Sequence, residues 1–259
     1  MVPPSLEERI KETILAWENL TWDYDTELMK TSNERLNAID EPLLSRVSGK
    51  VLEVGCGTGR LAKPVEALGG EYTGIDPSVK LLKQAFNKGV ISLVRGVGEY
   101  LPFPDNYFDT IIGGYHSFRY IFLDKAYSEC ARVLKPGGIL VFTLWNYWSL
   151  CLHTVSANVR TFKTPWSDLP PFPTSKTGEA CNDLVWFYGE KKRLQKTGLK
   201  VVSVLSTRRF PLLNRYMSWR GYWHGSIGSL IGYDVIITCK NGKASTERNH
   251  DFKVNQREF

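Results

Sequence analysis

Residues 51–59 read VLEVGCGTG, and this stretch decides the fold. A short apolar strand pattern runs into three glycines that alternate with other residues, and a segment typical of a helix follows. Glycine lets the backbone approach a ligand closely and adopt angles that a Cβ atom would forbid. The N-terminus of a helix adds backbone N–H donors that have no partner within the helix. The stretch therefore predicts a ligand site between a strand and a helix.

An acidic residue ends the next strand pattern, YTGID at residues 72–76. Asp76 follows Gly57 by 19 residues (76 minus 57). A carboxylate at this place can accept hydrogen bonds from both hydroxyls of a ribose. The nicotinamide dinucleotide fingerprint G-x-G-x-x-G would need glycine at position 60, where this chain has Arg60. The spacing G-x-G-x-G, with Glu53 two residues ahead, instead suits a ligand without a pyrophosphate.

Strand and helix patterns alternate around this stretch. The expected strands cover residues 51–54, 72–75, 91–94, 110–112 and 139–144, and the expected helices cover 58–68, 78–87 and 124–134. Such alternation indicates a parallel sheet with helices on both faces and right-handed crossovers. Two more strand patterns, at 199–207 and 233–239, raise the expected number of strands to seven. The predicted fold is α/β, with a doubly wound, mostly parallel seven-stranded sheet.

The remaining segments are interpreted as parts of one domain, 1–259. Residues 1–45 are expected to form a helical cap, with Ile10, Ile14, Leu15, Trp17 and Leu20 near one face of a helix over 6–29, ahead of the core at 46–145. Residues 146–184 hold four prolines among aromatic side chains and are predicted to form an inserted lid. A C-terminal helix and a strand pair are expected over 185–240, with an aromatic, partly helical stretch at 212–225. Residues 241–259 form a polar tail.

Composition places few limits on function. The chain has 259 residues, a hydrophobic fraction of 42%, and a formal net charge of +6, which permits an anionic partner such as RNA or simply aids solubility. The five cysteines form no C-x-x-C pair, so we expect reduced, buried thiols and no metal site. No apolar run is long enough to span a bilayer and the N-terminus lacks a signal core, so we expect a cytoplasmic protein.

Four segments in order resemble the class I S-adenosylmethionine-dependent methyltransferases. VLEVGCGTG at 51–59 is similar to motif I of that family, and YTGIDPS at 72–78 to its second-strand motif. GEYLPFPDNYFD at 98–109 resembles a segment of the ubiquinone/menaquinone-biosynthesis branch, known as methyltransferase type 11, and LKPGG at 134–138 resembles the turn before the fifth strand. The resemblance implies a Rossmann-like methyltransferase fold, S-adenosyl-L-methionine as cofactor and S-adenosyl-L-homocysteine as product.

The resemblance also implies roles for individual residues in binding the cofactor. Gly55, Cys56 and Gly57 would form the floor under the methionine part, and Glu53 would lie near its amino group or orient the loop. Asp76 would hold the ribose hydroxyls, Pro77 would pack on the adenine, and Gly98 would lie at the adenine edge. The chain has Val97 where many relatives have an aspartate for the adenine amino group, so Glu99 or a backbone carbonyl would replace it. Tyr24 resembles an aromatic element that folds over the cofactor; a role as a core aromatic of the cap is equally open.

The acceptor side is predicted from position. In doubly wound sheets the chemistry lies beyond the carboxyl ends of the strands, and the strand at 110–112 is followed by GGYHSFRY at 113–120. Tyr115, His116 and Arg119 are therefore the candidate catalytic residues. His116 has the intrinsic pKa of a general base, although a histidine packed on the next helix would look the same. Arg119 could pair with an anionic acceptor or lie on the helix surface.

Four functions remain open at this point, of which the fourth is aminopropyl or another non-methyl transfer on the same fold. The first is methyl transfer to a small molecule, with an apolar or aromatic acceptor held by the aromatic side chains of 145–187 (Trp145, Tyr147, Trp148, Phe162, Trp166, Phe172, Trp186 and Phe187). The second is methyl transfer to tRNA or rRNA, suggested by arginines that alternate with aromatics over 208–223. The third is a non-catalytic regulator that binds the cofactor. The sequence does not fix the oligomeric state.

Overall fold

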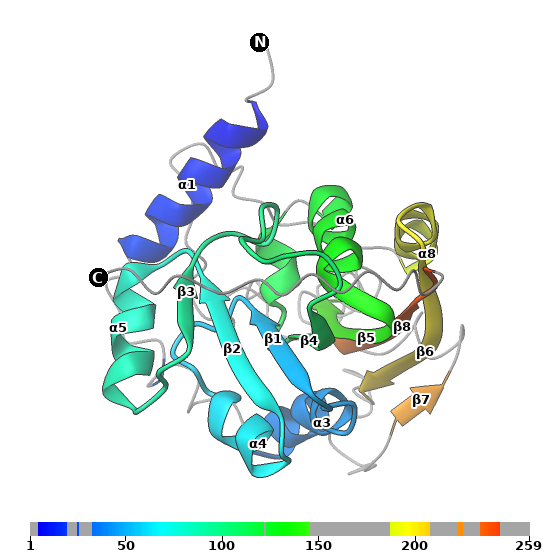
Figure 1. Ribbon diagram of the computed structural model, residues 1–259, viewed down its shortest axis with the longest axis horizontal. Helices are drawn as coiled ribbons and strands as arrows, with labels where there is room; N and C mark the ends of the chain where they lie inside the picture. Colours follow the sequence, from blue (N-terminus) through cyan, green and yellow to red (C-terminus); the bar gives the residue numbers. More distant parts are fainter. Residues whose placement is uncertain are drawn as a thin grey trace, which may run out of the picture.

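The computed structural model describes residues 5–19, 25, 33–121, 123–145, 187–207, 222–224 and 234–243. Within these residues eight strands form one sheet in the order β3-β2-β1-β4-β5-β8-β6-β7 (Figure 1). The first five strands along the chain are parallel neighbours: β1 (Lys50–Val54), β2 (Glu71–Asp76), β3 (Leu93–Arg95), β4 (Phe108–Gly113) and β5 (Leu134–Trp145). The predicted α/β, doubly wound fold is confirmed.

The other end of the sheet is antiparallel. Strand β8 (Asp234–Asn241) lies between β5 and β6 (Leu199–Thr207) and is antiparallel to both. A short strand β7 (Tyr222–His224) pairs with the outer edge of β6, so the sheet has one strand more than expected. These three residues belong to the stretch expected to be partly helical; in the fold they pair with the edge of β6 instead. Because β8 is antiparallel, its first residue lies at the edge where the parallel strands end.

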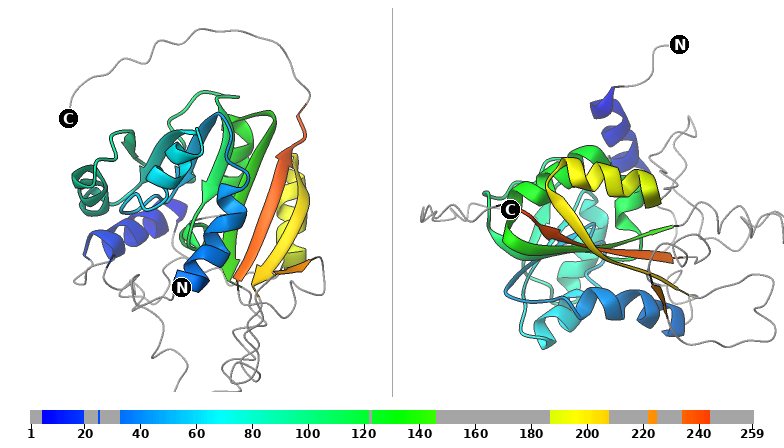
Figure 2. Two further views of the ribbon diagram at one scale, coloured as in Figure 1. Left: turned by 90° about the horizontal axis from the view of Figure 1, so that it is seen from below. Right: turned by 90° about the vertical axis from the view of Figure 1, so that its right-hand side faces the viewer.

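Helices cover both faces of this sheet (Figure 2). One face carries α6 (Leu123–Val133) and α8 (Phe187–Lys196), and the other carries α3 (Asn33–Leu44), α4 (Ala62–Ala67) and α5 (Val79–Asn87). Successive strand residues therefore enter different cores: Leu52 and Ile111 pack on the α6 side, and Val51 and Ile112 on the α3 side. In the described part of the chain, no helix combines the length and apolarity that a membrane span requires.

Several element boundaries differ from the sequence prediction; the N-terminal helix, expected over 6–29, ends at Glu18 with Asn19 as its C-cap. The helix expected from residue 58 begins only at Ala62, because Gly55, Gly57 and Gly59 all have positive φ angles and extend the loop. The fifth strand begins at Leu134 instead of residue 139. Its pairing with β4 jumps from Phe108↔Leu134 to Thr110↔Ile139, so the LKPGG segment bulges out of the ladder.

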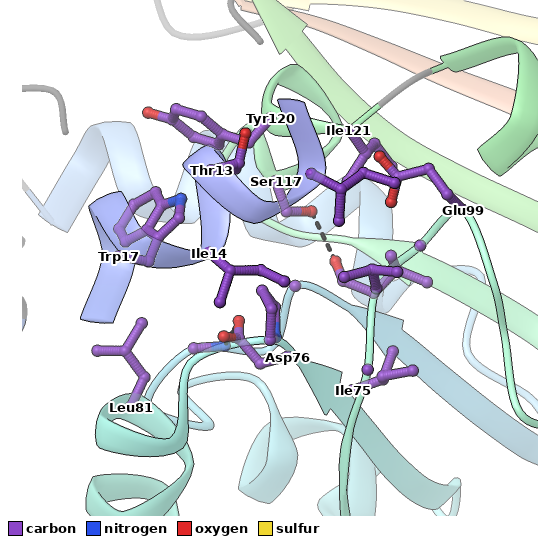
Figure 3. Close-up of a pocket in the computed structure, with 18 of the residues that line it drawn as sticks. Thr13, Ile14, Trp17, Ile75, Asp76, Leu81, Glu99, Ser117, Tyr120 and Ile121 are labelled. Carbon is purple, nitrogen blue, oxygen red and sulfur yellow. Dashed lines mark hydrogen bonds between the residues drawn. The ribbon is translucent and has the colours of Figure 1, made fainter. Parts of the chain in front are cut away.

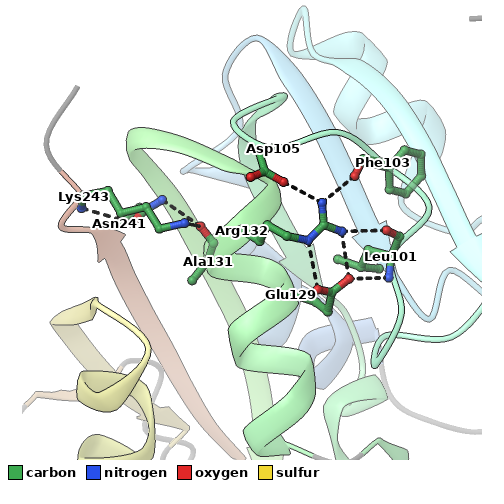
Figure 4. Close-up of polar contacts among 8 residues, drawn as sticks. All are labelled: Leu101, Phe103, Asp105, Glu129, Ala131, Arg132, Asn241 and Lys243. Carbon is green, nitrogen blue, oxygen red and sulfur yellow. Dashed lines mark hydrogen bonds and ion pairs between the residues drawn. The ribbon is translucent and has the colours of Figure 1, made fainter. Parts of the chain in front are cut away.

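Arg132 on α6 fixes the loop between β3 and β4 (Figure 4). Its guanidinium donates hydrogen bonds to the carbonyl oxygens of Leu101 and Phe103 at 2.8 Å and to Glu129 and Asp105. Glu129 in turn accepts from the backbone N–H of Leu101 at 2.9 Å, and the Arg132 hydrogen bonds lower the pKa of Glu129. This loop carries Gly98 and Glu99, so α6 positions one wall of the site described next.

Candidate active site

A pocket opens at the carboxyl ends of β1, β2 and β4 (Figure 3). About 770 Å³ of space without protein atoms, open solvent included, lies between its lining atoms. The lining comes from α1 (Leu6–Glu18), the glycine loop after β1, the end of β2, the loop after β3, and the segment after β4. The lining residues are mostly apolar, with carboxylates from Asp76 and Glu99. This is the edge where ligands bind in doubly wound sheets.

The glycine loop is held against β2 by backbone hydrogen bonds. The N–H groups of Gly55 and Cys56 both donate to the carbonyl oxygen of Ile75, at 2.8 and 3.1 Å. Gly55 has φ +74°, and a Cβ atom there would lie 2.5 Å from the Cβ of Ser117. Gly57 has φ +52°, and a Cβ atom there would meet nothing within 4 Å. Both glycines line the pocket, so the loop presents bare backbone to a ligand.

Asp76 joins this loop to the start of α5. Its Oδ2 accepts a hydrogen bond from the N–H of Gly57 and its Oδ1 accepts one from the N–H of Ser78, both at 2.9 Å. The side chain is 6% exposed, and burial raises its pKa to about 6, while the two backbone hydrogen bonds act in the opposite direction. Each carboxylate oxygen retains a second lone pair, so Asp76 can still accept from a ligand hydroxyl.

Glu53, at β1, and Cys56, within the glycine loop, are both buried and are not part of the pocket lining. Glu53 is buried and accepts a hydrogen bond of 2.6 Å from the hydroxyl of Tyr72. Burial raises the pKa of Glu53 to about 8, so its carboxyl is largely protonated at neutral pH. The hydrogen bond from Tyr72 ties Glu53 to β2; its role in orienting the glycine loop and its contact with a cofactor both stay predictions.

The pocket lining includes the residues that the resemblance assigns to the adenine end of the cofactor: Pro77, Val97, Gly98 and Glu99. Glu99 is 2% exposed, and Val97 supplies only an apolar surface. A Cβ atom on Gly98 would come within 3.1 Å of side chains of Ile121 and Val54, so glycine permits a close approach here. Glu99 is thus the carboxylate on this wall.

Helix α1 supplies a wall of the pocket that the sequence did not assign. Ile10, Thr13, Ile14 and Trp17 line the pocket, and the Trp17 ring meets Tyr120 edge-on at a centroid distance of 5.0 Å (Figure 3). The spacing of these four residues is that of one helix face, which was the available signal. Leu15, expected on the same face, is 58% exposed, and Leu20 lies outside the described residues.

Two contacts connect the N-terminal region to the rest of the site. Glu18 at the end of α1 accepts a hydrogen bond of 2.6 Å from the N–H of Val79, the first residue of α5. Asp25 accepts a hydrogen bond of 2.7 Å from the Thr58 hydroxyl and pairs with Lys88. Tyr24, the predicted cofactor contact, lies outside the described residues. Asp25 itself lies beside the glycine loop, through its hydrogen bond with Thr58.

The segment after β4 has an unusual backbone. Tyr115 and His116 are consecutive non-glycine residues with φ +42° and +63°. Such conformations cost roughly 1–3 kcal/mol each, and they persist only where surrounding contacts enforce them. Tyr115 lines the pocket, whereas His116 is 3% exposed and lies behind Tyr115, with ring centroids 5.6 Å apart. The side chain of Arg119 lies outside the described residues.

His116 has a partner that sequence reasoning missed. Its Nε2 lies 3.0 Å from Oδ1 of Asp234, and both side chains are almost completely buried. Asp234 is the first residue of β8, and nothing in its local sequence marks it as a site residue. The structure therefore brings together Tyr115 and most of the predicted cofactor residues and adds Asp234 behind them. The catalytic role of His116 stays a prediction.

Comparison with known proteins supports the resemblance found in the motifs. Residues 52–142 match the family described as "Methyltransferase domain". A fatty-acid O-methyltransferase of Mycolicibacterium smegmatis is 37% identical over 108 residues, which cover 38% of each chain. A ubiquinone/menaquinone biosynthesis C-methyltransferase of Burkholderia mallei is 37% identical over 132 residues, which cover 47% of this chain and 53% of that one. The chain thus matches only about two-fifths to one-half of the length of these curated relatives.

Solved structures extend the likeness over the whole fold. A methyltransferase from Thermotoga maritima, described as a possible histamine N-methyltransferase, superposes with a TM-score of 0.64 at 19% identity, covering 88% of this chain and 99% of that one. A methyltransferase from Haloferax volcanii, solved with the Trm112 activator, gives 0.58 at 16% identity, covering 89% and 98%. At such identities only the fold is shared.

Proposed function

We propose that this chain, a class I methyltransferase by family and fold, transfers the methyl group of S-adenosylmethionine to a small molecule with an apolar or aromatic part. The observation that carries the proposal is the position of the Asp76 carboxylate. It accepts a hydrogen bond from the N–H of Gly57, in a glycine loop that presents its backbone to one side of a mostly apolar pocket. Such a carboxylate can accept hydrogen bonds from the hydroxyls of a ribose, and glycines without side chains let the methionine part lie close to the backbone. The two features meet at one edge of the sheet.

The cofactor-binding residues divide the pocket along its length. Asp76 would accept from the ribose hydroxyls, and Gly55 and Gly57 would lie beside the methionine part. Pro77 and Gly98 would border the adenine, and Glu99 would accept from its amino group in place of the missing aspartate at Val97. Trp17 and Ile14 of α1 would cover the bound molecule and exclude water, which favours transfer of a charged group.

The chemistry demands positioning more than acid–base catalysis. The bound sulfonium supplies an already activated methyl group, so the protein must hold the acceptor in line with it. Tyr115 and Gly114 line the pocket at the end of β4, beside Gly55, and would form the boundary with the acceptor. Where the acceptor atom carries a proton, His116 is the proposed proton acceptor, and Arg119 the proposed partner of an anionic group.

A small-molecule acceptor is favoured over RNA. The described pocket lining is mostly apolar, and the relatives named above include enzymes of fatty-acid and quinone chemistry. The arginine and aromatic side chains behind the RNA alternative lie at 208–223, for which the structure describes only the backbone of 222–224. The aromatic side chains of 145–187 proposed to hold the acceptor likewise lie outside the described residues.

The decisive test uses cofactor labelled in its methyl group. The protein is incubated with cell extract separated into small-molecule, RNA and protein fractions, and mass spectrometry follows the label. We expect a labelled product in the small-molecule fraction and none in a parallel reaction with Asp76→Ala. Label in the RNA fraction would establish the alternative function, and label in no fraction, with no cofactor binding by calorimetry, would refute methyl transfer.

A further inference from the structure

Ser117 lines the pocket where the segment after β4 lies against the glycine loop. A Cβ atom added to Gly55 would lie 2.5 Å from the Cβ of Ser117, so the missing side chain at Gly55 permits this close approach. The Ser117 hydroxyl is hydrogen-bonded to the carbonyl oxygen of Val54, the last residue of β1, at 2.7 Å (Figure 3). Ser117 therefore lies directly beside the loop that is proposed to hold the methionine part of the cofactor.

A strained turn brings Ser117 to this place. The N–H of Ser117 donates to the carbonyl oxygen of Gly114 at 3.1 Å. Between them lie Tyr115 and His116, with φ +42° and +63°. Two successive positive φ angles are characteristic of a type I′ turn, in which glycine, asparagine and aspartate predominate. The N–H of His116 donates to the Thr143 hydroxyl on β5 at 2.7 Å, so the neighbouring strand helps to enforce the turn.

The hydrogen bond to Val54 fixes the way in which the Ser117 hydroxyl can act. A carbonyl oxygen only accepts, so the single hydroxyl proton of Ser117 is the donor. The serine oxygen keeps two lone pairs, and donation to the carbonyl polarises it into a better acceptor. Toward a ligand Ser117 therefore offers an acceptor for an N–H or O–H group. A ligand carboxylate would have to compete with Val54 for the proton.

We propose that Ser117 binds the amino group of the methionine part of S-adenosylmethionine, by accepting a hydrogen bond on its side-chain oxygen. The inference rests on the proposed function. That amino group is positively charged at neutral pH and has only donors to offer. Hydrogen bonds from a charged donor are roughly twice as strong as those between neutral groups, so one well-placed acceptor has a measurable effect on affinity.

The acidic residues near the glycine loop are engaged elsewhere. Glu53, which the resemblance places near this amino group, does not line the pocket and accepts a hydrogen bond from Tyr72. Burial raises the pKa of Glu53 to about 8, so its carboxyl carries little charge at neutral pH. Asp76 lines the pocket but holds Gly57 and is proposed to bind the ribose. Ser117, on the wall opposite the loop, supplies an acceptor that neither carboxyl provides.

Binding of three stable cofactor analogues tests the inference without knowledge of the methyl acceptor. S-adenosylhomocysteine carries the amino group, its deaminated analogue has hydrogen in that place, and 5′-methylthioadenosine lacks the whole amino-acid part. By calorimetry, the wild type should bind S-adenosylhomocysteine about tenfold or more tightly than the deaminated analogue, as expected for a hydrogen bond to a charged group. Ser117→Ala should lower this ratio about fivefold or more and should change the affinity for 5′-methylthioadenosine by less than about threefold.

Ser128→Ala is the matched control. The Ser128 hydroxyl likewise donates to a backbone carbonyl, that of Asp124 on α6 at 3.0 Å, but at an exposed position outside the pocket lining. This variant should leave all three affinities unchanged. Ser117→Cys keeps the shape of the side chain with a weakly accepting sulfur, so it should lower the ratio as alanine does. It takes the place of Ser117→Ala if that variant does not fold.

Three results would overturn the inference. The first is a wild type that binds S-adenosylhomocysteine and its deaminated analogue equally well. The second is a ratio that the folded Ser117 variants leave unchanged. The third is an equal loss of affinity for all three ligands in those variants, because Ser117 would then only shape the loop. A wild type that binds none of the three ligands would instead refute the proposed function.

Discussion

The carboxylate of Asp76 accepts a hydrogen bond of 2.9 Å from the backbone N–H of Gly57. The end of β2 thereby fixes the loop that follows β1, and the same carboxylate also holds the start of α5 through Ser78. A ligand that contacts Asp76 must therefore lie beside the glycine loop. Because one side chain both shapes the loop and faces the pocket, loop geometry and cofactor binding should change together when Asp76 is altered.

Asp76→Ala should weaken binding of S-adenosylmethionine by at least roughly 1.5–3 kcal/mol, the usual worth of hydrogen bonds to a charged group. The variant loses the proposed ribose contacts and also frees the N–H of Gly57. Titration calorimetry measures the loss, with Asp105→Asn, an exposed carboxylate on the β3–β4 loop, as control. Unchanged affinity in Asp76→Ala, or tighter binding of NAD than of S-adenosylmethionine, would refute the assigned site.

Cofactor affinity should also depend on pH through Asp76. Burial raises the pKa of this carboxyl to about 6, and only the ionised form accepts from both ribose hydroxyls while it holds Gly57 and Ser78. Affinity should thus be constant above about pH 7 and should fall as pH drops through 6 toward 5. Calorimetry at several pH values checks this. An affinity that does not change between pH 5 and 7.5 would show that protonation of Asp76 does not control binding.

Glu53 should make stability decrease as pH rises. Its pKa in the fold is about 8, raised by burial from 4.5, so the unfolded chain loses the proton first. Between these values the unfolded state binds fewer protons, and the free energy of unfolding falls with pH, by on the order of 5 kcal/mol over the full window. Glu53→Gln removes this effect and can keep the hydrogen bond from Tyr72.

Thermal unfolding of Glu53→Gln and the wild type at pH 5, 7 and 9 measures the effect. The stability of the variant relative to the wild type should increase with pH. Glu66→Gln, at an exposed position on α4, is the control and should show no such trend. A constant difference between Glu53→Gln and the wild type across this range would mean that Glu53 is ionised in the fold at neutral pH.

Gly55→Ala should destabilise the fold more than a comparable change elsewhere. At Gly55 a Cβ atom would add a contact of 2.5 Å with Ser117 to the strain of φ +74°. Gly69→Ala is the matched control, because Gly69 has φ +81° but nothing within 4 Å of the added atom. We expect about 1–2 kcal/mol of lost stability for Gly69→Ala, from backbone strain alone, and at least twice as much for Gly55→Ala. Equal losses in denaturant unfolding would show that Ser117 moves aside freely.

Trp17→Ala should lower cofactor affinity although the residue lies far from the glycine loop in sequence. The indole lines the pocket and packs edge-on against Tyr120, so its removal uncovers the bound molecule. We expect a loss of about tenfold, or ~1.4 kcal/mol, by calorimetry with S-adenosylhomocysteine. Leu15→Ala changes the exposed side of the same helix and should have no effect. Equal affinities of the two variants would indicate that α1 does not cover the ligand.

The sequence by itself determined the parts of the site that depend on neighbours along the chain. Gly55, Gly57 and Asp76 were found because a strand, a glycine turn and an acidic strand end have fixed local spacings, and parallel strands bring their carboxyl ends to one edge. The five parallel strands were also predicted, since each is a short apolar run between turn signals. The glycine loop was predicted too short, because positive φ at Gly59 delays the helix to Ala62.

Tertiary structure alone decided which distant groups complete the site. The wall from α1, the burial of Glu53 against Tyr72 and the pairing of His116 with Asp234 all join residues that no local pattern connects. Asp234 reaches His116 only because β8 is antiparallel between β5 and β6, which sets its first residue at the end of the parallel strands. Burial and partner choice follow from packing across the sheet, and packing is a property of the folded chain as a whole.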